Sequence, residues 1–187
     1  MGIDEILLNA EEAMEKALAH LTSEFHKVRT GKASPTLVEN ITVEAYEGTH
    51  LKLRELASIT APEPRLIIIQ PWDASTVDAI RRGIEAAGIG ISPLVDGKII
   101  RLPIPELSQE RREELVKIIR KMTEEQRVVV RHARRDALDL LRKNQKDGKI
   151  TEDELAAAEK DVQKLTDTYI EKLDKTLSVK ESELLKI

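Results

Sequence analysis

The sequence predicts an α+β protein: an elongated three-helix bundle with a small α/β domain inserted between the first and second helices. All seven prolines and six of the eight glycines lie between residues 31 and 105, whereas both flanks carry long helical repeats of apolar residues. Aromatic residues make up only 2% of the chain, so its cores must be built from aliphatic side chains. We therefore predict that residues 1–30 and 106–187 form the bundle and that residues 31–105 form the inserted domain.

The first helix is predicted over residues 3–29. Ile3, Ala10 and Ala17 recur every seven residues, and a second set interleaves with them: Leu7, Met14, Leu21 and Val28. Apolar positions repeating about every 3.5 residues are typical of helix bundles and coiled coils. Gly31 is placed to end this helix, and Pro35 prevents it from restarting.

The middle block alternates strand and turn signals. Residues 41–46 alternate in the manner of a strand and are followed by a turn at 47–49. Residues 66–70 and 99–102 are short apolar strand candidates, and the pair Asp96-Gly97 predicts a turn before the second of them. Residues 75–87 have helical spacing, and Gly88 directly after them is placed to stop the helix.

Residues 108–146 predict a second, longer helix with two opposed faces. At about 100° per residue, the apolar side chains of this segment gather on one side. The predicted apolar face consists of Leu115, Ile119, Met122, Val129, Val130, Ala133, Ala137, Leu140 and Leu141. Five arginines fall within roughly 100° of one another on the opposite side: Arg127, Arg131, Arg134, Arg135 and Arg142.

A capping box at residues 151–154 opens the third predicted helix, whose apolar positions continue to Leu184 and Leu185. None of the three long helices can bury its apolar stripe alone, so they must pack together. Two crossings then join the bundle to the inserted domain, and we expect them to form a hinge. The predicted hinge residues are Thr30, Gly31, Pro103, Ile104 and Pro105.

Composition and motifs argue against several functional classes. The chain has no cysteine, and its histidines are scattered without metal-ligand spacing: His20, His26, His50 and His132. We find no nucleotide-binding glycine motif, no catalytic constellation and no apolar run of the ~18 residues needed to span a membrane. We therefore expect a cytoplasmic protein that is not an enzyme and that has no cofactor, metal, small-molecule substrate or membrane partner.

The arginine face is the sharpest functional signal. Residues 127–147 carry seven Lys or Arg against three Asp, in a chain whose formal net charge is −4. Exposed faces of long helices are often charged, and Asp139 is spaced to neutralise Arg135 or Arg142. Arginine rather than lysine nevertheless favours bidentate phosphate recognition, which indicates an RNA partner, with an acidic protein as the alternative. A coiled-coil scaffold that binds another helix is a further hypothesis. The single tryptophan, Trp72, is more typical of a packing or turn residue than of a base-stacking one.

Several ordered motifs resemble those of the ribosome recycling factor family. They are Val28-Arg-Thr-Gly-Lys-Ala-Ser-Pro35, Leu56-Ala-Ser58, Gln70-Pro-Trp-Asp73, Glu106-Leu-Ser-Gln-Glu-Arg-Arg112, Val130-Arg-His-Ala-Arg-Arg-Asp136 and Asp161-Val-Gln-Lys-Leu-Thr-Asp167. The resemblance runs along essentially the whole chain. It implies an L-shaped protein of about the size of tRNA that binds the large ribosomal subunit after termination. With elongation factor G and the GTP hydrolysis of that partner, such a factor separates the subunits.

The family pattern places the RNA-binding arginines at Arg131, Arg134 and Arg135, with Arg29 and Lys32 adding charge at the hinge end. We also assign Arg127 and Arg142 to the predicted RNA-binding set, and we expect a monomer. The sequence departs from the family pattern at Lys32, where arginine is usual, and in residues 45–48 and 87–93. The latter departures bear on contacts with the GTPase, because they lie in the small domain.

Overall fold

The computed structural model of the chain describes residues 1–185, which form two compact units. Unit 1 consists of Met1–Arg29 together with the chain from Gln109 onward, and unit 2 consists of Thr30–Ser108. Unit 1 is helical and unit 2 contains the strands, so the predicted α+β fold class is confirmed. In the described residues, no helix is both long and apolar enough to span a membrane.

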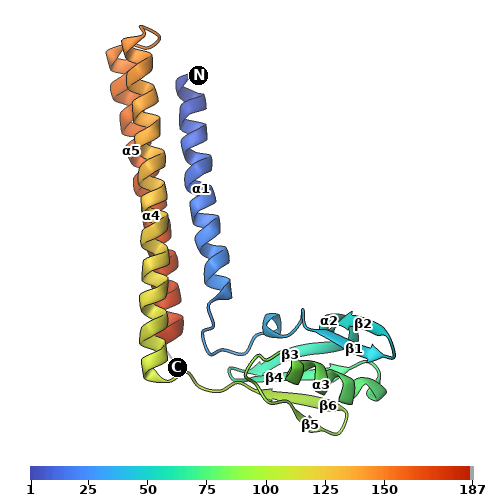
Figure 1. The fold of residues 1–187 in the computed structure, drawn as a ribbon. Coiled ribbons are helices and arrows are strands. Elements are labelled where there is room, and N and C mark those ends of the chain that lie inside the picture. The colour runs from blue at the N-terminus through green and yellow to red at the C-terminus, as the bar shows by residue number, and fades with distance from the viewer. Residues whose placement is uncertain (186–187) are drawn as a thin grey trace. The chain divides into compact units, whose positions relative to one another are not determined.

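Unit 1 is a bundle of three long helices, α1 (Ile3–Lys27), α4 (Gln109–Lys146) and α5 (Glu152–Leu185). Each of the three contacts both of the others, and they run side by side in Figure 1. The Asn144 side chain donates a hydrogen bond of 3.0 Å to the backbone oxygen of Met1. The beginning of α1 therefore lies at the end of α4, and the two helices are antiparallel.

The connection between α4 and α5 follows the sequence signals closely. Gly148 adopts a positive φ of 70°, which a glycine tolerates without strain. The Thr151 hydroxyl accepts a hydrogen bond from the backbone N–H of Glu154 at 3.2 Å, and the Glu154 carboxylate accepts one from the N–H of Thr151 at 2.7 Å. The predicted capping box is thus present and satisfies two backbone donors at the start of α5.

The bundle core differs from the predicted apolar face of α4 at two positions. Val129 and Leu140 are 42% and 41% exposed, whereas Ile119, Val130 and Leu141 are fully buried. The two exposed side chains lie at the edge of the predicted stripe, outside the part of α4 that its neighbours cover. Three polar side chains of α4 are also buried: Thr123, whose hydroxyl donates to the Ile119 oxygen, Arg112 and Asn144.

Unit 2 contains a two-stranded and a four-stranded antiparallel sheet. The predicted strands are present as β1 (Thr42–Tyr46), β4 (Leu66–Pro71) and β6 (Ile99–Pro103). Strands β2 (Thr49–Lys52), β3 (Ala57–Glu63) and β5 (Leu94–Asp96), and the short helix α2 (Leu53–Leu56), were not predicted. The four-stranded sheet has the order β3-β4-β6-β5, which places β3 and β5 at its edges.

Helix α3 (Val77–Ala86) packs against β1 and closes the core of unit 2. A Cβ atom placed on Gly83 of α3 would lie 2.8 Å from the Val43 Cγ2 atom, so the absence of a side chain permits this close approach. Val43, Ile69, Ile80 and Ile100 are fully buried in the same core.

Unit 2 holds both segments that connect it to the bundle. Gly31 is buried and has a φ of 77°. Pro103 is the last residue of β6, and Ile104 is 4% exposed, with its N–H donating to the Arg65 oxygen at 2.8 Å. The irregular part of the returning connection that follows these contacts is therefore short, covering residues 105–108.

Candidate nucleic-acid interface

Of the three described helices of the bundle, α4 alone carries a net positive charge. This helix carries twelve Lys and Arg against seven Asp and Glu, whereas α1 carries two against six and α5 carries five against ten. An anionic polymer is therefore attracted to α4 and repelled by α1 and α5. Four of the five predicted arginines of α4 line one shallow groove.

The groove has a volume of about 620 Å³ and lies along α4. Its lining consists of Val128, Arg131, His132, Arg134, Arg135, Leu138, Asp139 and Arg142. Each of these residues has another of them three or four positions away, which is the spacing of neighbours on one side of a helix. The groove thus combines four guanidinium groups with a single carboxylate and two aliphatic side chains.

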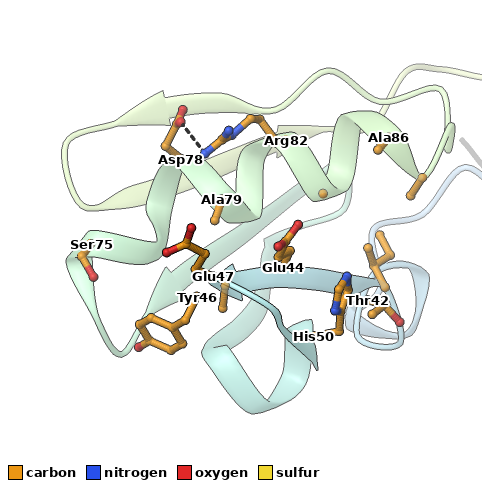
Figure 2. Close-up of a pocket in the computed structure, with 14 residues that line it drawn as sticks. Thr42, Glu44, Tyr46, Glu47, His50, Ser75, Asp78, Ala79, Arg82 and Ala86 are labelled. Carbon is orange, nitrogen blue, oxygen red and sulfur yellow. Dashed lines mark ion pairs between the residues drawn. The ribbon is translucent and has the colours of Figure 1, made fainter.

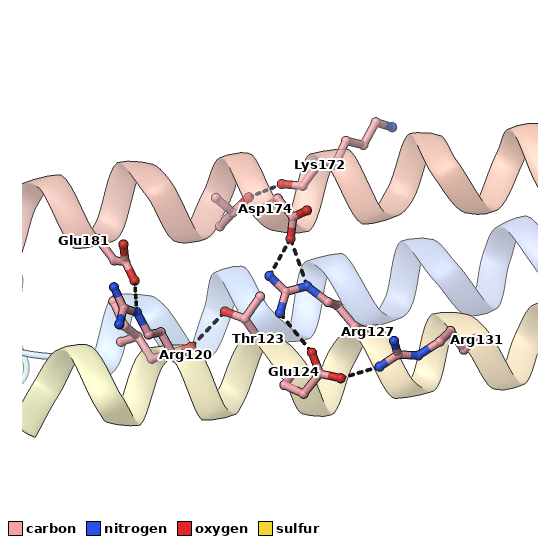
Figure 3. A network of polar contacts seen from close by, with 10 residues as sticks. Arg120, Thr123, Glu124, Arg127, Arg131, Lys172, Asp174 and Glu181 are labelled. Atoms are coloured by element: carbon pink, nitrogen blue, oxygen red, sulfur yellow. Dashed lines mark hydrogen bonds and ion pairs between the residues drawn. The ribbon is translucent and has the colours of Figure 1, made fainter.

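Arg127 is held inside the bundle rather than on an open face. Its side chain is 24% exposed, its Nη2 atom lies 2.5 Å from Asp174 Oδ1 on α5, and its Nη1 atom lies 2.9 Å from Glu124 Oε2. Figure 3 shows the guanidinium between these two carboxylates. Hydrogen bonds from Arg127 and Arg131 keep the pKa of Glu124 below its usual value. Helical spacing places Arg127 in the same row as the other four arginines, but α5 supplies a carboxylate, 47 residues away in sequence, that holds its guanidinium against the bundle.

Two of the groove arginines, Arg131 and Arg142, each form an ion pair with a carboxylate. Arg131 forms an ion pair with Glu124, which it shares with Arg127, and its side chain is 54% exposed. Arg142 Nε lies 3.0 Å from Glu159 Oε1 on α5. Both arginines can still offer donors to a ligand, but each must share its charge with a carboxylate.

Arg134 and Arg135 occupy the centre of the groove with little compensation. Arg134 Nη1 donates to the neutral side chain of Gln163 on α5 at 2.6 Å, and its Nε atom is buried without a hydrogen-bond partner among the described residues. Arg135 is 78% exposed, and its Nε atom lies 4.0 Å from Asp139, the weakest of the ion pairs along this groove. These two guanidinium groups are the ones best placed to bind an external anion.

The remaining predicted residues are not brought to the groove. Arg29 follows α1, which is antiparallel to α4, so it lies toward the beginning of α4 and away from Arg142. Lys32 is exposed and belongs to unit 2. Sequence reasoning missed His132 and Gln163, although helical spacing places His132 one turn after Val128. In the described residues, no group of three or more His, Asp or Glu is arranged to hold a metal ion.

Comparison with known proteins assigns this architecture to one family. The family model described as ribosome recycling factor matches residues 21–185 of the chain. The chain belongs to the ribosome recycling factor family. The ribosome-recycling factors of Carboxydothermus hydrogenoformans and Halalkalibacterium halodurans are 48% and 46% identical to it. These matches cover 99% and 98% of this chain, and 100% and 98% of the respective relatives.

Solved structures of the ribosome recycling factor family agree with this assignment. A solution structure of a ribosome recycling factor matches with a TM-score of 0.74 and 38% identity, covering 100% of this chain and 99% of the other. A second match, also 38% identical, has a TM-score of 0.63 and covers 99% of this chain and all of the other. It comes from models of the Thermus thermophilus ribosome recycling factor and the Escherichia coli elongation factor G bound to the E. coli post-termination complex.

Proposed function

We propose that this chain acts in the cytoplasm as a non-enzymatic ribosome recycling factor, binding ribosomal RNA of the large subunit through α4 after termination. Elongation factor G would supply the GTP hydrolysis, and the two proteins together would separate the subunits. Family membership and the relative assembled with elongation factor G on the post-termination complex support this role. The observation that carries the RNA contact is the groove centred on Arg134 and Arg135.

Two features of the groove, its row of arginines and its few apolar side chains, favour RNA over an acidic protein as its ligand. Arginine presents a planar fork of donors that matches two phosphate oxygens, and four such forks lie along about three turns of one helix. The groove is shallow and offers only two aliphatic side chains, Val128 and Leu138, to a protein partner. Phosphate recognition by shape and charge needs no deeper pocket.

The contribution of each arginine follows from its partners in the bundle. Arg131, Arg134, Arg135 and Arg142 are proposed as RNA contacts, with Arg134 and Arg135 the strongest. Arg127 is proposed to act mainly by holding α4 against α5, because two carboxylates already occupy its guanidinium. Arg29 and Lys32 are proposed as auxiliary basic residues near the crossings between the units.

The proposed hinge lies in the two connections between the units. Thr30 and Gly31 form the outgoing connection, and Gly31 has the conformational freedom of glycine at its positive φ. On the returning side, Pro103 and Ile104 pack with unit 2, so we place the motion at Pro105 and the irregular residues that follow it.

A matched pair of variants tests the proposed RNA contact. We expect Arg135→Ala to weaken co-sedimentation with isolated large subunits about 10-fold without lowering thermal stability. The slope of log K against log salt should become shallower by roughly 0.7–0.9 if one phosphate contact is lost. Arg127→Ala is the control within the same helix, and it should retain most of the binding while losing about 1 kcal/mol of stability.

Subunit separation is the second readout. Light scattering of post-termination ribosomes with elongation factor G and GTP should show splitting by the unaltered chain and slower splitting by Arg135→Ala. Equal binding and splitting by Arg135→Ala and the unaltered chain would argue against the groove as the RNA contact. Failure of the unaltered chain to split ribosomes would contradict the proposed function itself.

A further inference from the structure

Charge, rather than aromatic stacking, supplies the affinity of the α4 groove for RNA. No tryptophan, tyrosine or phenylalanine of the described chain lines this groove. The single tryptophan, Trp72, belongs to unit 2, where its side chain is 72% exposed. The expectation that Trp72 is a packing residue is therefore wrong, although it does precede a turn. RNA binding through the groove then depends on how much guanidinium charge the bundle leaves uncompensated.

The ion pairs between α4 and α5 follow a regular register. They join three arginines of α4 to carboxylates of α5: Arg120 to Glu181, Arg127 to Asp174 and Arg142 to Glu159. A step of seven residues forward along α4 leads from the first pair to the second, and the same step leads backward along α5. Matching steps of this kind keep arginine and carboxylate side by side, because the two helices are antiparallel. Figure 3 shows the first two of these pairs.

Arg134 interrupts this series. One further step of seven residues leads to Arg134 on α4 and to Asp167 on α5. The register therefore predicts an ion pair between them, but none is present in the part of the chain that the structure describes. Instead, Arg134 Nη1 donates to Gln163 Oε1 at 2.6 Å, and Gln163 Nε2 donates to Asp167 Oδ1 at 2.8 Å. Gln163 thus takes the place of an acidic partner on Arg134 and binds the acidic partner itself.

The amide of Gln163 is suited to both contacts. It carries a neutral acceptor, which faces Arg134, and a donor, which faces Asp167. A reversed amide would set its NH₂ group against the guanidinium, so the hydrogen bond to Asp167 fixes the orientation that Arg134 requires. Because the acceptor is neutral, the positive charge of Arg134 is not cancelled. Its Nη2 atom has no partner among the described residues and is left to donate to a phosphate.

A cleft of unit 2 shows the opposite charge balance. This cleft of about 980 Å³ is lined by the carboxylates of Glu44, Glu47 and Asp78 and by a single guanidinium, that of Arg82. Arg82 Nη2 lies 3.3 Å from Asp78 Oδ2, one turn earlier in α3, and Figure 2 shows this ion pair. A carboxylate at the position of the partner therefore removes the charge that an anion would need. The neutral partner of Arg134 is the feature that distinguishes the α4 groove.

We propose that Gln163 is a positioning residue for RNA binding, which orients Arg134 and prevents Asp167 from neutralising it. The inference rests on the proposed function, in which the α4 groove binds ribosomal RNA. It also gives a role to residues 161–167, which resemble the family pattern but belong to the acidic helix α5 and do not line the groove.

Gln163→Glu tests the need for a neutral acceptor. The change keeps the size of the side chain and places a carboxylate on Arg134, so binding to isolated large subunits in co-sedimentation should weaken about 10-fold. The slope of log K against log salt should become shallower by roughly 0.7–0.9, as for one lost phosphate contact. Thermal stability should stay the same or rise, a combination that a merely structural role of Gln163 would not produce.

A second pair of variants tests the part that Asp167 plays. Gln163→Ala should free Asp167 to pair with Arg134 and should weaken binding about fivefold. Adding Asp167→Asn to the same chain should restore binding to within about twofold of the unaltered level, because no carboxylate is then left opposite Arg134. If Gln163 only supported the packing of α4 against α5, the second substitution could not restore binding.

Two control variants separate this local effect from general ones. Ser178→Glu adds the same charge at an exposed position of α5, about 22 Å along the helix from Gln163, which exceeds the Debye length of about 8 Å at physiological salt. Arg82→Ala removes a guanidinium that is already paired, in unit 2. Both variants should bind isolated large subunits as the unaltered chain does.

Two results would overturn the inference and leave the proposed function standing, provided that Arg135→Ala weakens binding. Unchanged binding by Gln163→Glu would show that Arg134 does not need a neutral partner. Failure of Asp167→Asn to recover the binding lost in Gln163→Ala would show that Asp167 is not the competing group. Failure of the unaltered chain to bind large subunits would instead contradict the proposed function, and the inference with it.

Discussion

A buried tyrosine between two helices predicts a specific pH dependence of the bundle. Tyr169 of α5 is 4% exposed, and its hydroxyl donates a hydrogen bond of 2.7 Å to the Glu15 carboxylate of α1. Burial, the hydrogen bond to Glu15 and the negative charges of Glu15 and Glu11 raise the pKa of Tyr169 to about 12. Replacing Tyr169 with phenylalanine removes the hydroxyl and keeps the ring.

The sign and size of the effect follow from this shift. An unfolded tyrosine has a pKa of about 10, so the folded state holds the phenolic proton more tightly. The resulting stabilisation is complete below pH 10 and is lost as the pH rises from 10 toward 12. Two pKa units set an upper limit of ~2.7 kcal/mol. We expect about 1 kcal/mol of it to be lost between pH 8 and 11, because solvent reaches Glu15 and weakens the interaction.

Urea unfolding followed by ellipticity at 222 nm measures this effect, because most helical residues belong to the bundle. At pH 8, Tyr169→Phe should be about 1 kcal/mol less stable than the unaltered chain. By pH 11 this difference should nearly vanish. Tyr46→Phe is the control, since the other tyrosine of the chain lies on the surface of unit 2 and should leave the bundle unchanged. A constant difference between the two proteins from pH 8 to 11 would refute the reasoning.

Two further predictions concern the folding of each unit. Gly83→Ala should destabilise unit 2 by about 1 kcal/mol, because the close contact of the new methyl group with Val43 outweighs the gain in helix propensity. The unfolding of unit 2 in urea can be followed by the fluorescence of Trp72. The cost should shrink or reverse in a Val43→Ala background, whereas simple additivity would contradict the contact. Thr151→Ala should lower the free energy of unfolding by about 1 kcal/mol, because it removes the N-terminal cap of α5. Thr151→Ser keeps the hydroxyl and should lower it much less. Equal losses of stability by the two variants in thermal melts would count against the capping role.

The long helices were predictable because their signals are local. A seven-residue repeat, a glycine after the last turn and a capping box each act within a few residues, and the observed α1 and α4 agree with the predicted ranges to within two residues at each end. The burial of individual side chains of α4 is not determined by local sequence alone. It depends on where α1 and α5 cross the stripe, and this placement leaves Val129 and Leu140 at its edge.

Strands β3 and β5 were not predicted because their local sequence does not indicate a strand, and they form through pairing with other strands of the sheet. Pro62 lies inside β3, and a proline argues against a strand in the middle of a sheet. β3 is an edge strand, where a missing N–H need not break a ladder on both sides. β5 has three residues and, among the described strands, pairs with β6 alone, so its hydrophobic pattern is too short to predict a strand.

Local sequence determines where the arginines of α4 lie, whereas the packing of α5 against α4 determines which of them have partners on α5. Helical spacing alone gathers the arginines into one row, and the nearby Asp139 gives Arg135 its weak local partner. Arg127 and Arg142 each have a carboxylate partner on α5, 47 and 17 residues away, so the register between α4 and α5 determines these two ion pairs. The same register places the neutral Gln163 against Arg134. A shift of α5 by one turn would redistribute these partners, so the charge left for RNA at the centre of the groove depends on the packing of the bundle as well as on the sequence of α4.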